Sequence, residues 1–156
     1  MPLRETCRQL DPEAFPFRKV LEGRFRDIDA RRHINNIAVA ELFSEGRTHF
    51  IHDFFEEIER PEGMFFVVGQ QALFYAGEAH YPGRIEVCTG LFEIGRSTLR
   101  TGQAFFNDGH CTAIAEAVLV CSRGGRAVPL PGVFRERAER FLLPEGTLPR
   151  QLAALR

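Results

Sequence analysis

The feature that most constrains this chain is a long amphipathic helix followed by four strand-like segments in an unbroken row. Between Asn36 and about Glu59, apolar residues recur at three- and four-residue steps, as on the buried face of a helix. They are Val39, Phe43, Gly46, Phe50 and Phe54. Asn35 and Asn36 can cap this helix, and Pro61 cannot continue it. Gly46, in the middle of the stripe, predicts that the helix lies close against a sheet.

The segments after the helix are rich in aromatic and β-branched residues, and the sequence predicts strands at Phe65–Ala79, Ile85–Ile94, Thr98–Asn107 and Cys111–Ser122. The short connections Gly95-Arg96 and Asp108-Gly109 make the flanking strands antiparallel neighbours. A further strand is expected before the helix at Phe17–Phe25, and a short helix near the end at Val133–Leu142. This order predicts an α+β fold, in which one antiparallel sheet of about five strands packs on one long helix.

The length of the chain, 156 residues, suits one domain with a core of its own. We therefore expect a single domain over 1–156, with a loose lead-in over 1–14, a core at about 17–132, and a short helix and tail over 133–156. One helix cannot cover a five-stranded sheet completely, so the exposed remainder is expected to meet another subunit. A homodimer or homotetramer is the prediction.

The formal net charge of −1 argues against a nucleic-acid partner, since such proteins normally carry a basic face. The N-terminus lacks the apolar run of a secretory signal, and no stretch is long and apolar enough to span a membrane. These features predict a cytoplasmic protein without a membrane partner. The cysteines are scattered, which favours reduced thiols over disulfides or a zinc site. They are Cys7, Cys88, Cys111 and Cys121.

The densest group of functional side chains is the segment DIDARRHINN, residues 27–36, between the first strand and the long helix. A helix N-terminus presents unpaired N–H groups and a partial positive charge, which can hold an oxyanion. A carboxylate just upstream could attack a carbonyl there or activate a water. From the residues alone, however, Asp27 and Asp29 are better explained as loop acids neutralised by neighbouring arginines.

The segment from Arg24 to Asn36 resembles the signature of hot-dog thioesterases of the 4-hydroxybenzoyl-CoA thioesterase-like family. Its Asp-x-x-x-His-x-Asn-Asn stretch is most similar to bacterial long-chain acyl-CoA thioesterases. The resemblance continues in Glu41–Arg47 and, more weakly, in Phe92–Ser97 and Val128–Pro131. It implies the hot-dog fold, whose sheet wraps around a central helix. It also implies hydrolysis of an acyl-CoA thioester to a free carboxylic acid and coenzyme A. Coenzyme A is then part of the substrate, and no cofactor is expected.

The resemblance assigns the catalytic carboxylate to Asp29, as nucleophile or general base. It assigns the oxyanion donor to the backbone N–H of Asn36, at the start of the helix. Asp27 is better explained as structural, as an ion-pair partner.

Four further residues are implied to contact the substrate. His33 and Asn35 stand where close relatives have His and Asn, and they shape the loop and the pocket. Arg96 and Ser97 fall in a turn where relatives contact the phosphates of coenzyme A.

Two residues depart from the family pattern and leave the acyl preference open. Arg32 stands where many members have Gly, and Val39 replaces a common Tyr of the first helical turn. Two alternatives to an acyl-CoA thioesterase remain, and the two departures bear on the second of them. One is an enzyme acting on acyl carrier protein, and the other is a non-catalytic acyl-CoA-binding protein of the same fold.

A metal site is not expected. His49, His52 and Asp53 could form a metal face together with Glu45, but they share the helix with apolar neighbours and the spacing implies no further ligand. A solvated or interface helix face is the preferred interpretation.

Overall fold

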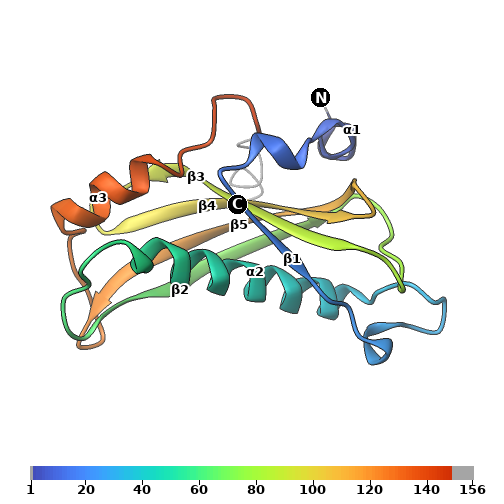
Figure 1. Cartoon of the computed structure of the whole chain (residues 1–156), viewed down its shortest axis with the longest axis horizontal. Coiled ribbons are helices and arrows are strands. Elements are labelled where there is room, and N and C mark those ends of the chain that lie inside the picture. Colours follow the sequence, from blue (N-terminus) through green and yellow to red (C-terminus); the bar gives the residue numbers. More distant parts are fainter. Residues whose placement is uncertain (1, 149–156) are drawn as a thin grey trace.

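The computed structural model describes residues 2–148, and Figure 1 shows how its elements are arranged. The α-helices in this part of the chain are α1 (Leu3–Gln9), α2 (Asn36–Glu56) and α3 (Gly132–Glu139). The strands are β1 (Phe17–Leu21), β2 (Met64–Tyr75), β3 (Ile85–Ile94), β4 (Thr98–Asn107), β5 (His110–Arg123) and β6 (Arg126–Ala127). Single 3₁₀ turns are η1 (Pro12–Ala14) and η2 (Phe25–Asp27).

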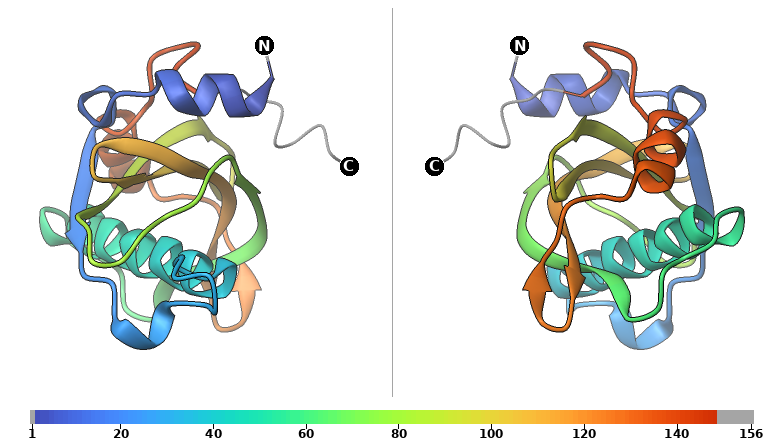
Figure 2. Two further views of the ribbon diagram at one scale, coloured as in Figure 1. Left: turned by 90° about the vertical axis from the view of Figure 1, so that its right-hand side faces the viewer. Right: turned by 90° about the vertical axis from the view of Figure 1, so that its left-hand side faces the viewer.

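One antiparallel sheet holds these strands in the order β1-β3-β4-β5-β2, with β6 paired to the end of β5. At the hairpin between β4 and β5, Asp108 and Gly109 both have positive φ, as a tight type I′ turn requires. The sheet curls over α2, as Figure 2 shows. The expected α+β class and the sheet wrapped around one long helix are thereby confirmed, together with the bounds of β3 and β4.

The buried face of α2 is the apolar stripe that the sequence indicates, and all five stripe residues are buried. Gly46 lies directly against β3. A Cβ atom at this position would lie only 2.6 Å from Cγ1 of Val87, so no side chain fits between helix and sheet. The close helix–sheet approach predicted from Gly46 is confirmed.

Strand β2 ends at Tyr75, short of the expected Ala79, because the ladder breaks there. The N–H groups of residues 76 and 77 both donate to the carbonyl of Thr112, at 2.8 and 2.9 Å. The chain then leaves the sheet and crosses to the loop before α2, where the N–H of Ile34 donates to the carbonyl of Ala79 at 2.8 Å. This crossing brings residues of two distant segments together beside the start of α2.

Other element ends also differ from the sequence-based expectation. β1 stops at Leu21 rather than at the expected Phe25, which begins turn η2. α2 stops at Glu56, before the Pro61 that was expected to end it, and α3 stops at Glu139 rather than near Leu142.

The N-terminal segment is not the loose lead-in that its composition predicts. It forms α1 and η1, and a disulfide joins Cys7 of α1 to Cys111 of β5, with a Cα–Cα distance of 5.5 Å. The expectation of reduced thiols is therefore wrong for this pair. Cys88 and Cys121 are free and buried, as expected of small apolar side chains. Disulfides are rare in the cytosol, so this bond weighs against the cytoplasmic location, which stays a prediction.

None of the helices in residues 2–148 is long and apolar enough to cross a membrane. The last part of the expected C-terminal tail, from residue 149 onward, lies outside the described residues.

Candidate active site

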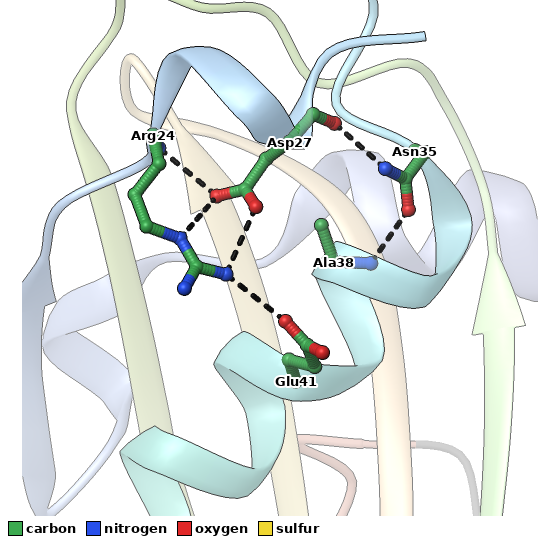
Figure 3. Close-up of polar contacts among 5 residues, drawn as sticks. All are labelled: Arg24, Asp27, Asn35, Ala38 and Glu41. Carbon is green, nitrogen blue, oxygen red and sulfur yellow. Dashed lines mark hydrogen bonds and ion pairs between the residues drawn. The ribbon is translucent and has the colours of Figure 1, made fainter.

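The loop between β1 and α2 is held by an ion pair at its first turn. The guanidinium of Arg24 donates to both carboxylate oxygens of Asp27, at 3.1 and 2.9 Å, and also reaches Glu41 of α2 at 3.0 Å (Figure 3). Asp27 is buried, and the hydrogen bonds from Arg24 hold its pKa below the usual value. Asp27 is thus an ion-pair partner that stabilises the loop, as the sequence indicates.

Asn35 fixes where the helix begins. Its side-chain oxygen accepts from the N–H of Ala38 at 2.8 Å, and its side-chain amide donates to the carbonyl of Asp27 at 2.9 Å (Figure 3). Asn35 is therefore the helix N-cap, and Asn36 is the first residue of α2. No described group accepts a hydrogen bond from the N–H of Asn36, as expected for an orphan donor in the first helical turn.

Asp29 closes a tight turn on the other side of this loop. Its Oδ1 accepts from the N–H groups of Arg31 and His33, at 2.8 and 3.1 Å. These two bonds lower the pKa of Asp29, and the bond from the N–H of His33 has the larger effect. The carboxylate is therefore ionised at neutral pH. None of the described residues donates to Oδ2, which leaves this oxygen available. Arg32 completes the turn with a φ of 64°, the left-handed conformation that Gly adopts readily.

A pocket of about 230 Å³, here called the Asp29 pocket, opens between this turn, the start of α2, the end of β2 and the beginning of β5. Asp29, His33 and Asn36 all line it. The structure therefore places the carboxylate and the helix N-terminus, which the sequence paired, around one cavity. Asn35 lies behind the wall as a cap rather than in the lining.

Two polar residues of the pocket wall were not singled out from the sequence. The hydroxyl of Tyr75 donates to the carbonyl of Asn36 at 2.9 Å and ties β2 to the start of α2. Thr112 is 8% exposed, and its Oγ1 has no hydrogen-bond partner among residues 2–148. Both side chains come from strands far along the chain, so only the sheet register could have revealed them.

Glu78 and His80 are the other residues that sequence reasoning missed. They lie on the chain segment that crosses to the loop before α2. Nε2 of His33 is 3.2 Å from a carboxylate oxygen of Glu78, and the Arg31 guanidinium is 3.6 Å from the same side chain. The rings of His33 and His80 meet edge to face, with centroids 4.9 Å apart.

Arg96 and Ser97 do not reach the Asp29 pocket of their own chain. They occupy the turn between β3 and β4, whereas the pocket lies where β4 ends and β5 begins. Ten residues of β4 separate the two ends of the sheet, or roughly 30 Å at the usual rise per residue. The carbonyl of Ser97 accepts from the N–H of Cys121, which fixes the turn at this far end.

The possible metal face on α2 does not form. His49 pairs loosely with Glu45, at 3.9 Å, and Asp53 contacts Arg137 of α3 at 3.4 Å. In the described part of the chain, these residues do not bring three ligand atoms together.

Comparison with known proteins gives the family. The sequence profile of the thioesterase-like superfamily matches residues 24–138. No curated protein sequence matches this chain.

Three solved structures show the relationship. A thioesterase from Thermus thermophilus, solved with coenzyme A and Zn, is 28% identical, with a TM-score of 0.72 over 83% of this chain and 96% of that chain. A DHNA-CoA thioesterase from Staphylococcus aureus is 18% identical, with a TM-score of 0.66 over 80% of this chain and 87% of that one. A hypothetical protein from Staphylococcus aureus, solved in complex with CoA, is 16% identical, with a TM-score of 0.76 over 87% of this chain and 90% of that chain.

The two Staphylococcus aureus proteins are only 18% and 16% identical to this chain, so the comparison with them shows a shared fold and nothing about function. The profile match spans most of the chain, including the Asp29 loop and α2. With its sheet wrapped around one long helix, this chain therefore belongs to the thioesterase-like superfamily and has the hot-dog fold.

Proposed function

We propose that this protein hydrolyses an acyl-CoA thioester to a free carboxylic acid and coenzyme A. The observation that carries the proposal is that an ionised carboxylate, Asp29, and the unpaired N–H of Asn36 line one pocket. The family supports the reaction, and the coenzyme A bound by the Thermus thermophilus relative supports the substrate class.

The N-terminus of α2 would bind the thioester carbonyl. The N–H of Asn36 points out of a helix of 21 residues, whose aligned peptide dipoles give this end a partial positive charge. Negative charge develops on the carbonyl oxygen when the carbonyl is attacked, and a fixed N–H donor stabilises that charge.

Asp29 would supply the attacking group. If Asp29 acts as the nucleophile, its free Oδ2 forms a bond to the carbonyl carbon of the thioester. The carbon–sulfur bond then breaks, and coenzyme A leaves as the thiolate. Water then hydrolyses the mixed anhydride. As general base, Asp29 instead takes a proton from a water that attacks the carbonyl directly. Either route needs neither a metal nor a redox cofactor.

Thr112 has a supporting place in this proposal. Its hydroxyl is buried in the pocket wall and has no hydrogen-bond partner in the described chain. A hydroxyl in that state gains a hydrogen bond when a water or a substrate oxygen arrives, so we assign to it the orientation of the attacking water or the acyl group.

The test is thiol release from a panel of acyl-CoA thioesters, short, long and aromatic. Asp29→Asn keeps the shape of the side chain but removes its charge, and it should lower turnover by roughly 100-fold or more. The matched control is Asp108→Asn, which makes the same change in the β4–β5 hairpin and should leave turnover unchanged. Turnover at the wild-type rate in Asp29→Asn would exclude Asp29 as the catalytic carboxylate.

Acyl carrier protein is the second candidate carrier of the substrate. Arg26 and Arg32 are exposed in the loop between β1 and α2 and form no ion pair within residues 2–148, and such cations suit an acidic carrier. Comparing hydrolysis of the same acyl group on the two carriers decides between them. Saturable acyl-CoA binding without turnover on either carrier would favour the non-catalytic alternative.

A homodimer would complete the coenzyme A site. β2 is an edge strand, and its apolar side chains Phe65, Val67 and Val68 are 47–51% exposed. Antiparallel pairing of two copies of β2 around a two-fold axis would cover these side chains. It would also bring the far end of one sheet toward the Asp29 pocket of the other.

In that arrangement, Arg96 of the partner subunit would approach the coenzyme A phosphates. Arg96→Ala should then raise KM for acyl-CoA but not for an acyl-pantetheine, which lacks the nucleotide. The mass in solution tests the dimer itself, and two such dimers would make the tetramer.

A further inference from the structure

Two histidines and a carboxylate meet at the rim of the Asp29 pocket. One ligand atom from each of His33, Glu78 and His80 lies within 4.8 Å of the others. His33 comes from the loop before α2, and the other two come from the segment that follows β2. No sequence spacing brings these residues together, and the catalytic proposal above does not use Glu78 or His80.

The backbone holds the two histidines in register. His33 and His80 form an antiparallel bridge, and the N–H of the neighbouring Ile34 donates to the carbonyl of Ala79. The buried side chain of Asn107 also holds the backbone of His80 through two hydrogen bonds. It accepts from the N–H of His80 at 2.9 Å and donates to the carbonyl of His80 at 3.3 Å. The positions from which the two imidazoles project are therefore fixed before any ligand arrives.

The distances suit a small divalent ion after a short movement of the side chains. Zn²⁺ binds imidazole nitrogen and carboxylate oxygen at about 2.0–2.2 Å, so tetrahedral ligands stand about 3.3 Å apart. His33 and Glu78 already have this separation, at 3.2 Å. The Glu78 side chain is 54% exposed and His80 is also exposed, so both are free to close on an ion.

We infer that His33, Glu78 and His80 bind one Zn²⁺ or a similar borderline transition-metal ion at the rim of the Asp29 pocket. Two imidazoles and one carboxylate form a ligand set that zinc favours, and a fourth position is left for water. Binding displaces Arg31, whose exposed guanidinium is held by Glu78 only at 3.6 Å. The ion also holds the ring of His33, whose backbone N–H donates to Asp29.

Zinc titration of the untagged protein tests this site without any measurement of turnover. The chain is first stripped with a chelator and kept free of reductant, so that Cys7 and Cys111 stay bonded and cannot act as ligands. Calorimetry should show one Zn²⁺ bound per chain. Co²⁺ should give the intense visible absorption of a four- or five-coordinate site, and Zn²⁺ should raise Tm.

The variants His80→Ala and Glu78→Gln should each weaken Zn²⁺ binding by more than about tenfold and abolish the Tm shift. The matched control is His52→Ala, an exposed histidine of α2, which should bind like the wild type. Unchanged Zn²⁺ affinity in both ligand variants overturns the assignment, as does the absence of binding to the folded wild-type protein. Because catalysis is not measured, this outcome is separate from any failure of the thioesterase proposal.

Discussion

The Asp29 loop shows how single residues set the geometry of the site. The ion pair of Arg24 with Asp27 fixes its first turn, and the Asn35 cap fixes its last residue. Between them, Asp29 folds back on the N–H groups of Arg31 and His33. The sequence predicts the cap and the structural place of Asp27 from local chemistry. It cannot predict how Asp29 turns, because that depends on a left-handed residue at position 32.

Arg32 has a conformation that suits glycine better. A non-glycine residue with this φ is destabilised by roughly 1 kcal/mol, whereas glycine also loses more chain entropy on folding. Arg32→Gly should therefore leave the free energy of unfolding unchanged or raise it by up to about 1 kcal/mol. Ala30→Gly, in the same loop without positive φ, is the control and should lower it by about 0.5–1 kcal/mol. Urea unfolding measures both, and equal losses would contradict the strain at Arg32.

Asp27 should make stability depend on pH. Because its pKa is lower in the folded protein than in the unfolded chain, its stabilisation is present above about pH 4 and is lost as pH falls through the folded-state pKa. Asp27→Asn should lower the free energy of unfolding by about 1–3 kcal/mol at pH 7, with a difference from wild type that shrinks in acid.

Urea unfolding between about pH 7 and pH 2.5 measures this dependence. Arg24→Gln is the partner control, because it removes the same ion pair from the other side. In that background, Asp27→Asn should have little further effect. A difference that stays constant across this pH range would show that the ion pair does not carry the stabilisation.

At the scale of elements, the central contact is α2 against β3. Gly46 touches Val87 so closely that an added methyl group has no space. Helix propensity alone would make Gly46→Ala stabilising by about 1 kcal/mol, but overpacking of a filled contact is destabilising by about 1–3 kcal/mol. We expect the second effect to win and the free energy of unfolding to fall.

The double variant distinguishes overpacking from other causes. In the Val87→Ala background the contact with Cγ1 is gone, but Cβ of residue 87 still lies 2.8 Å from the added methyl group. Gly46→Ala should therefore stay destabilising there, but by less than in the wild type. Thermal or urea unfolding of the four proteins measures the coupling. Additive effects of the two substitutions would contradict direct contact between them.

Much of the element pattern could be predicted from the sequence, because short turns and apolar periodicity are local signals. β3 and β4 begin and end at the predicted residues, and α2 begins at the predicted Asn36. The end of β2 could not be predicted, because it depends on the Thr112 carbonyl of a distant strand. For the same reason, the sequence singled out Asp29 and Asn36, which line the pocket, but not Thr112, Glu78 or His80. Those residues reach the site only through the register of the sheet.

At the scale of the whole molecule, a disulfide joins α1 to the sheet. The Cys7–Cys111 bond ties the N-terminal helix to the start of β5, next to Thr112 in the pocket wall. The sequence pattern favoured reduced thiols because the two residues are far apart along the chain. Their proximity follows from the position of α1 over the sheet, which no local signal indicates.

Reduction should destabilise the protein. Closing a loop with a sequence separation of 104 restricts the unfolded chain strongly, and such bonds typically contribute about 2–4 kcal/mol. Urea unfolding with and without a thiol reductant should differ by this amount in the wild type. Cys121→Ala, a buried free cysteine, should keep that difference, whereas Cys111→Ala should lose it. The same difference in Cys111→Ala would mean that the reductant acts elsewhere.

The disulfide also decides how the folded chain would bear mechanical load. If the two ends were pulled apart, tension would enter at the N-terminus, cross from Cys7 to Cys111 through the sulfur atoms, and continue into β5. The segment between the cysteines, with β1 to β4 and α2, would carry no load and could not be stretched. Only when a reductant opened the bond would this segment extend, releasing roughly 350 Å of hidden chain length for a separation of 104 residues.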